Sequence, residues 1–195
     1  MLHCTSTSTI RFLLLLPTVN KLLPLVACIL LVACEVPVAR VHGIAPFSMT
    51  KALPGMTASE TAELQPAAKL RPGAGLSETI GEYDVLYAFD STSATEVPPS
   101  ARMSSLSFMQ LLGEDPKAAT SAWATAVSEM RALLGSAPRR CGTILYARAT
   151  ATVATWSEGT DEVLVYLLND GEANRLFHSW KMGADSTSLT PIDCP

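Results

Sequence analysis

Apolar residues follow two different patterns along the chain. Near the amino terminus they form two continuous runs, Phe12–Pro17 and Leu22–Cys34, with Asn20 and Lys21 between them. Neither run has the ~20 uninterrupted apolar residues that a membrane-spanning helix needs. From about residue 79 onwards, apolar residues recur instead at the spacings of helices and strands. The pattern predicts a targeting segment followed by a folded domain.

The second apolar run has the parts of a secretory signal: a basic start at Lys21, an apolar stretch, and small residues near its end. It closes with Leu31-Val32-Ala33-Cys34, which resembles the lipobox of bacterial lipoproteins. The resemblance implies that the Cys34 sulfur receives a diacylglycerol group and that the chain is cleaved after Ala33. Several acyl chains make such a membrane anchor durable, because each buried CH₂ contributes about 0.8 kcal/mol.

These features predict a signal peptide over residues 1–33 and a lipid-anchored, periplasm-facing location in the cell envelope. Translation from Val19, through an alternative GTG codon, is a hypothesis that would give a signal of ordinary length. Glu35 stands where an Asp commonly marks inner-membrane retention, which favours the outer membrane if the organism is Gram-negative. An uncleaved membrane anchor is the alternative, although Glu35 and Pro37 would end its helix early.

Residues 34–78 are rich in proline, glycine and alanine, so no helical or strand period persists in them. We interpret this segment as an extended tether between the lipid anchor and the folded domain. Within it, Thr57 and Glu60 have the spacing of a capping box. They predict a short helix from Ala58 to Gln65.

Residues 79–195 predict one compact α+β domain. Its longest expected element is a helix from Pro116 to Leu134, where apolar residues recur at three and four positions until Gly135. Turns at Ser157–Thr160 and Asn169–Gly171 suit antiparallel hairpins. The remaining expected elements are a helix over 101–112 and strands over 83–89, 143–156, 162–168 and 174–182. We expect a small antiparallel sheet packed by one or two helices.

Alternation within residues 143–156 predicts which face of this sheet is buried. Leu145, Ala147, Ala149, Ala151 and Val153 alternate with more polar residues. We expect this odd-numbered face to pack under the helix, because its small alanines allow a close approach.

The exported part of the chain is acidic. All 18 Asp and Glu follow Cys34, with 12 of the 14 Lys and Arg, so its net charge is near −6. Nucleic-acid binding depends on clustered basic residues. The one adjacent basic pair, Arg139-Arg140, is more typical of a helix end or a solvated loop. We therefore expect no nucleic-acid partner.

The cysteine count agrees with export. Cleavage would remove Cys4 and Cys28 and lipid would occupy Cys34, which leaves Cys141 and Cys194 to pair. In the chain-entropy model, such a disulfide would contribute about 4 kcal/mol. Two free buried thiols are the alternative.

Candidate chemistry in the exported part is sparse. There is no G-x-S-x-G, no glycine-rich phosphate loop and no H-E-x-x-H, and the cysteines lack metal spacing, so we expect no metal and no cofactor. His178, beside Phe177 and Trp180, is more typical of a strand residue in an aromatic cluster than of a general base. With Tyr166 and the Glu158–Glu162 turn, it makes the one conceivable functional cluster.

These observations favour a cell-envelope lipoprotein whose small domain is not catalytic and binds a protein partner or the cell-wall layer. The membrane itself would be reached through the lipid anchor. A periplasmic enzyme or enzyme inhibitor is an alternative, and an accessory subunit of a secretion or adhesion machine is another. A cleft that brings His178 together with a carboxylate and a hydroxyl would favour catalysis.

Overall fold

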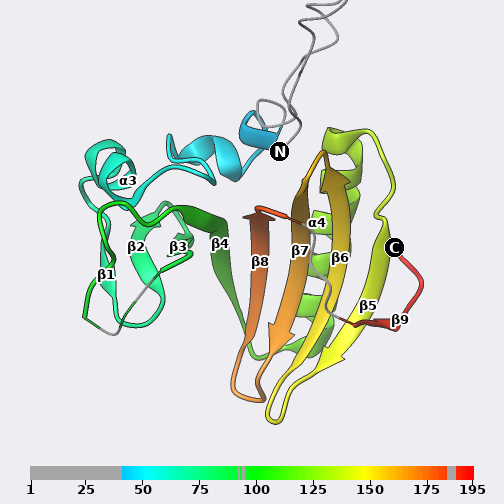
Figure 1. Cartoon of the computed structure of the whole chain (residues 1–195). Helices are drawn as coiled ribbons and strands as arrows, with labels where there is room; N and C mark the ends of the chain where they lie inside the picture. Colours follow the sequence, from blue (N-terminus) through cyan, green and yellow to red (C-terminus); the bar gives the residue numbers. More distant parts are fainter. Residues whose placement is uncertain (1–40, 92, 94, 184–187) are drawn as a thin grey trace, which may run out of the picture. The chain divides into compact units, whose positions relative to one another are not determined.

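In the part of the chain that the structure describes, nine strands form one antiparallel sheet in the order β1-β2-β3-β4-β8-β7-β6-β5-β9 (Figure 1). The computed structural model describes residues 41–91, 93, 95–183 and 188–195. The strands are β1 Lys69–Arg71, β2 Gly75–Ile80, β3 Tyr83–Phe89, β4 Met103–Gly113, β5 Arg140–Leu145, β6 Thr150–Glu158, β7 Asp161–Asn169, β8 Asn174–Lys181 and β9 Thr190–Pro191. The helical elements are η2 Phe47–Met49, α3 Ala58–Leu64 and α4 Pro116–Leu134. The predicted α+β class is confirmed, but the sheet is larger than expected.

The chain reaches the centre of the sheet twice. Strands β1 to β4 follow one another as a meander, and α4 then carries the chain past three strand positions to β5 near the far edge. Strands β6, β7 and β8 return towards the centre, so that β8 pairs with β4. The last segment crosses again from β8 to β9, which pairs with β5. The β4–β8 pair therefore joins residues distant in sequence.

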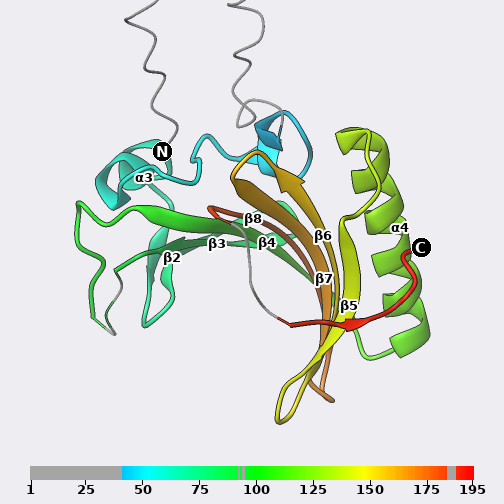
Figure 2. The same cartoon turned by 45° about the vertical axis from the view of Figure 1, so that its right-hand side comes forward.

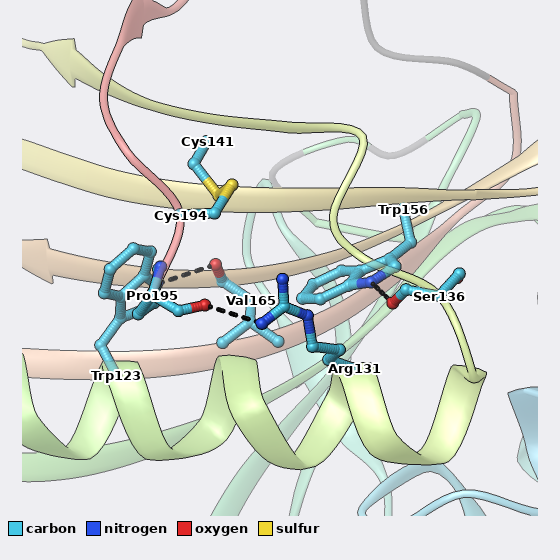
Figure 3. Close-up of a disulfide and its surroundings, with 8 residues drawn as sticks. All are labelled: Trp123, Arg131, Ser136, Cys141, Trp156, Val165, Cys194 and Pro195. Atoms are coloured by element: carbon cyan, nitrogen blue, oxygen red, sulfur yellow. Dashed lines mark hydrogen bonds between the residues drawn. A yellow bond between two sulfur atoms is a disulfide. The ribbon is translucent and has the colours of Figure 1, made fainter.

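Helix α4 has the ends that its sequence predicts. The Asp115 side chain accepts hydrogen bonds from the backbone N–H groups of Lys117 and Ala118, and Gly135 ends the helix with a φ of 67°. Its buried side chains form one stripe against β4, β7 and β8: Ala119, Trp123, Ala126, Val127, Met130 and Leu134. The Trp123 indole N–H donates to the Val165 carbonyl at 3.1 Å (Figure 3). This bond fixes the helix against β7.

Residues 41–78 are not an extended tether, and here the expected domain boundary at 79 is wrong. Val41, Phe47 and Ala52 are buried in the core. Phe47 makes edge-to-face contacts with Phe108 of β4 and Trp180 of β8, at centroid distances of 5.9 and 6.1 Å. Proline and glycine break the helical period here but do not prevent burial. The predicted capping box and short helix are confirmed, with α3 spanning Ala58–Leu64.

Two expected elements differ in type or extent. The helix predicted over 101–112 is strand β4, whose Leu106 and Phe108 are buried at a spacing of two residues. The single strand predicted over 143–156 is the hairpin β5–β6, closed by a hydrogen bond from Tyr146 N to Ala149 O. No Gly, Pro or Asn marks this turn, so it has no local signal. The strand predicted over 83–89 is confirmed.

The hairpin also inverts the predicted buried face. Leu145 pairs with Thr150, so residues of opposite parity share a face on the two strands. In β6 the side chains in the main core are Ala154 and Trp156, whereas Ala151 and Val153 face the opposite side of the sheet. Leu145 itself is 78% exposed.

The carboxyl-terminal tail is attached to the β5 edge and to α4. Cys141 and Cys194 form the predicted disulfide, with their Cα atoms 5.4 Å apart. Beyond it, the Pro195 carbonyl oxygen accepts a hydrogen bond from Arg131 of α4 (Figure 3). The tail therefore passes around the edge of the sheet to the helix side (Figure 2).

Candidate functional site

The two faces of the sheet are covered differently. Helix α4 and the segment that carries Phe47 pack on one face (Figure 2). In the described part of the chain, no helix packs on the other face of β5–β8. That face contains a cavity of about 310 Å³. We call it the open-face cavity; its lining residues come from β4–β8, the β5–β6 turn and Leu189.

The register of the strands places the side chains around the open-face cavity in rows that run across the sheet. Directly opposed residues of an antiparallel sheet lie on one face. One row crosses the strands β5, β6, β7, β8 and β4 as Arg140, Thr155, Leu164, Ser179 and Ser107. The row on one side of it contains Glu162, Lys181 and Ser105, and the row on the other side contains Gly142, Val153, Tyr166 and Phe177. The cavity is thus polar at one end and more apolar at the other.

The polar end of the open-face cavity has both positively and negatively charged side chains. Arg140 Nη2 lies 3.2 Å from Glu162 Oε1, and the Glu162 side chain is only 3% exposed. Lys181 lies directly opposite Glu162 across the β7–β8 pair and lines the cavity. A buried carboxylate is costly unless it is paired. Arg140 therefore stabilises Glu162 while its own side chain, 37% exposed, still reaches the cavity.

Hydroxyl groups occupy the middle of the open-face cavity. Ser107 Oγ and Ser179 Oγ are 2.6 Å apart and hydrogen-bonded. Burial raises the pKa of Tyr166 to about 12, and the nearby Tyr146 adds to the rise while a hydrogen bond with Ser179 opposes it. Thr155 is 1% exposed, and its Oγ1 has no hydrogen-bond partner among the described residues. An unsatisfied buried hydroxyl is uncommon, because it loses its bonds to water.

The structure does not bring together the cluster predicted around His178. His178 is buried in β8 and faces the α4 side, where its ring meets Tyr83 edge-to-face at 6.5 Å. Tyr166 lies on the opposite face, stacked on Phe177 at 4.4 Å. Burial lowers the pKa of His178 to about 4. The interpretation of His178 as a strand residue among aromatic side chains is confirmed.

The acidic turn is also divided between the two faces. Asp161 Oδ2 accepts a hydrogen bond from the Trp180 indole N–H at 3.1 Å on the α4 side. Glu162, the next residue, pairs with Arg140 on the other face. These two carboxylates therefore have separate structural partners and form no common site with His178.

Sequence reasoning missed the residues that build the open-face cavity. Arg140 was expected at a helix end or in a loop, but it begins β5 and pairs with Glu162. Thr155 belongs to a face that was expected to lie under the helix. Ser105 and Ser107 lie two residues apart, which is a strand spacing that could have revealed β4.

The remaining predicted features lie partly outside the structure. Cys34, the predicted lipidation site, and the signal peptide precede the first described residue. Within residues 41–195, apart from the few left undescribed, no helix is long and apolar enough to cross a membrane. The same residues contain no group of three His, Cys, Asp or Glu side chains that could hold a metal ion.

Comparisons with known proteins found no similarity. No family model matches the chain, and neither a curated protein nor a solved structure matches it.

Proposed function

We propose that this protein is a cell-envelope lipoprotein, anchored through Cys34, whose non-catalytic domain binds a protein partner or the cell-wall layer. Its binding surface is the face of β5–β8 that carries the open-face cavity. The observation that carries the proposal is the difference between the two faces: one is covered by α4 and Phe47, and the other has a hollow lined by charged and hydroxyl side chains. Natural binding sites are commonly such hollows with a few polar groups.

The enzyme alternative receives no support from the cluster that suggested it. His178 and Tyr166 lie on opposite faces, so one substrate cannot contact both side chains. Glu162 is held by Arg140. Binding therefore remains the function that the geometry supports best.

The anchor is tested by the intact mass of the protein extracted from membranes. We expect a species that begins at Cys34 and carries added acyl mass. Cys34→Ala should abolish both cleavage and acylation, whereas the matched variant Cys28→Ala should be processed normally. An unprocessed wild-type chain that retains Met1 or Val19 would contradict the anchor.

The binding face is tested by photo-crosslinking in living cells. A photoreactive amino acid at Tyr146, which is 55% exposed and lines the cavity, should give a specific adduct with an envelope component. The same group at Ser121, on the exposed side of α4, is the control. Equal adducts at both positions would count against a specific binding face, and the absence of an adduct at Tyr146 would count against the proposal.

A further inference from the structure

The two edges of the sheet are protected from further strand pairing in different ways. An edge strand has backbone groups with which another chain can pair, and charged side chains and proline commonly prevent this. The β1 edge, Lys69–Arg71, has a cation at each end and is followed by Pro72. Like charges that oppose each other destabilise a strand pair. Two copies of the β1 edge therefore do not pair readily.

At the other side of the sheet, β5 lies in a segment that favours strand pairing. Residues 141–147 contain no Asp, Glu, Lys, Arg, His or Pro. Thr143, Ile144 and Tyr146 are among the residue types that are enriched in strands. Segments of about six or seven residues with high β-propensity and low charge are prone to pair with other chains when they lie on a sheet edge. This edge therefore needs a cover.

The cover is the carboxyl-terminal tail, residues 188–195, which passes along β5 (Figure 2). Its strand β9 pairs with Gly142 and Thr143, and the Ile192 N–H donates to the Cys141 carbonyl oxygen at 3.1 Å. Strand β9 has two residues and ends in a proline, which lacks a backbone N–H. Such a short edge strand offers little to a further chain.

The tail approaches β5 closely because residue 142 is glycine. A Cβ atom at Gly142 would lie 2.5 Å from Leu189 Cβ and 2.8 Å from the Thr190 carbonyl oxygen. Both distances are well below the about 3.5 Å of van der Waals contact. The disulfide between Cys141 and Cys194 then makes the attachment covalent (Figure 3). The β5 edge is therefore built to hold the tail.

We propose that the tail is an edge cap that keeps the protein monomeric, and that β5 without this cap pairs antiparallel with β5 of a second copy. A second copy suits this edge because the same uncharged segment then forms both sides of the pair, so like charges do not oppose each other there. The resulting dimer has two-fold symmetry, with the same residues contributed by each copy. The inference concerns the sheet edge and does not rest on the proposed binding function of the open face.

Sedimentation equilibrium of the full chain in a density-matched detergent tests the cap, because it gives the mass of the protein without that of the micelle. The wild type, with its disulfide confirmed by mass spectrometry, should be monomeric. The double variant Cys141→Ala/Cys194→Ala should dimerise with a dissociation constant at least about tenfold lower, which corresponds to about 1.4 kcal/mol. Gly142→Ala should also favour the dimer, but less strongly, because its disulfide still holds the tail.

A charge at the β5 edge separates strand pairing from nonspecific association. Leu145 ends β5 and is 78% exposed, so a lysine at this position is compatible with the folded monomer. Adding Leu145→Lys to the double alanine variant should restore the monomer, because lysine on an edge strand opposes pairing. The matched control Leu133→Lys, on α4 at a side chain that is 50% exposed, should leave the dimer unchanged.

Three results would overturn the inference. The first is a wild type that dimerises as strongly as the double alanine variant. The second is monomeric behaviour of both the double alanine variant and Gly142→Ala. The third is an equal effect of Leu145→Lys and Leu133→Lys, which would indicate association through unfolded chains and not through the β5 edge. The open-face binding surface is tested separately, by the crosslink at Tyr146.

Discussion

Tyr166 and His178 stand on neighbouring strands, β7 and β8, yet their side chains lie on opposite faces of the sheet. Tyr166 pairs with Phe177, and His178 pairs with Val165, so the two residues are one position out of register. A one-residue offset in a strand moves a side chain to the other face. The same offset determines which titratable groups are buried in the core and which reach the open-face cavity.

Burial of His178 predicts a loss of stability in weak acid. Its pKa in the folded protein is lowered to about 4, below the ordinary value of about 6.5 in the unfolded chain. Between these values the unfolded state binds a proton that the native state does not, so stability falls as the pH drops from about 6.5 towards 4. Replacing His178 by Phe should make unfolding less pH-sensitive.

The measurement is the free energy of unfolding at pH 7 and at pH 4.5, for the wild type and His178→Phe. On going from pH 7 to pH 4.5, the wild type should lose roughly 2 kcal/mol more of its free energy of unfolding than His178→Phe loses. Glu129 lines the same side of His178, so Glu129→Gln serves as a control for that carboxylate. Parallel pH profiles for the wild type and His178→Phe would contradict the prediction.

Phe47 tests whether the segment before α3 belongs to the core. It is completely buried against Phe108 and Trp180, so Phe47→Ala should lower the free energy of unfolding by about 3–5 kcal/mol. Met49 is 41% exposed, so the control Met49→Ala should change the free energy of unfolding by less than about 0.5 kcal/mol. Denaturant titration followed by fluorescence of the buried tryptophans measures both. Equal, small effects would instead fit an extended tether.

The disulfide between Cys141 and Cys194 closes a loop with a sequence separation of 53. Replacing both cysteines by Ala should lower the free energy of unfolding by about 4 kcal/mol in the chain-entropy model. Reductant should destabilise the wild type by a similar amount and leave the double variant unchanged. Insensitivity of the wild type to reductant, with free thiols found by mass spectrometry, would show that the bridge does not form.

Because Arg140 and Glu162 form an ion pair, we expect substitutions at the two positions to have non-additive effects on the free energy of unfolding. Arg140→Gln removes the guanidinium that lies 3.2 Å from the nearly inaccessible carboxylate of Glu162. This substitution should lower the free energy of unfolding by about 1–3 kcal/mol, less than for a fully buried pair because Arg140 is over one-third exposed. Adding Glu162→Gln removes the buried charge and should restore most of that loss. A double-mutant cycle on the free energy of unfolding measures the coupling. Additive effects would mean that the two side chains are not energetically linked.

The sequence predicted correctly those elements that are specified by neighbouring residues, through caps, turn residues and the spacing of apolar positions. Asp115 and Gly135 bound α4, its apolar positions follow a helical period, and the turns at 157–160 and 169–171 contain their glycines. The disulfide followed from counting cysteines. Caps, turns and periodicity act over short distances, so no tertiary contact is needed to recognise them.

Strand pairing decided what the sequence left open. Ser107 and Ser179 are 72 residues apart, and only the β4–β8 register places their hydroxyls together. The burial of Phe47, the strand conformation of β4 and the alignment of Arg140 with Thr155 likewise depend on distant partners. The sequence by itself therefore determined α4 and the cysteine pair, and the export signal stays a prediction. Only the tertiary structure decided the open-face cavity, because register and non-local burial depend on which strands meet.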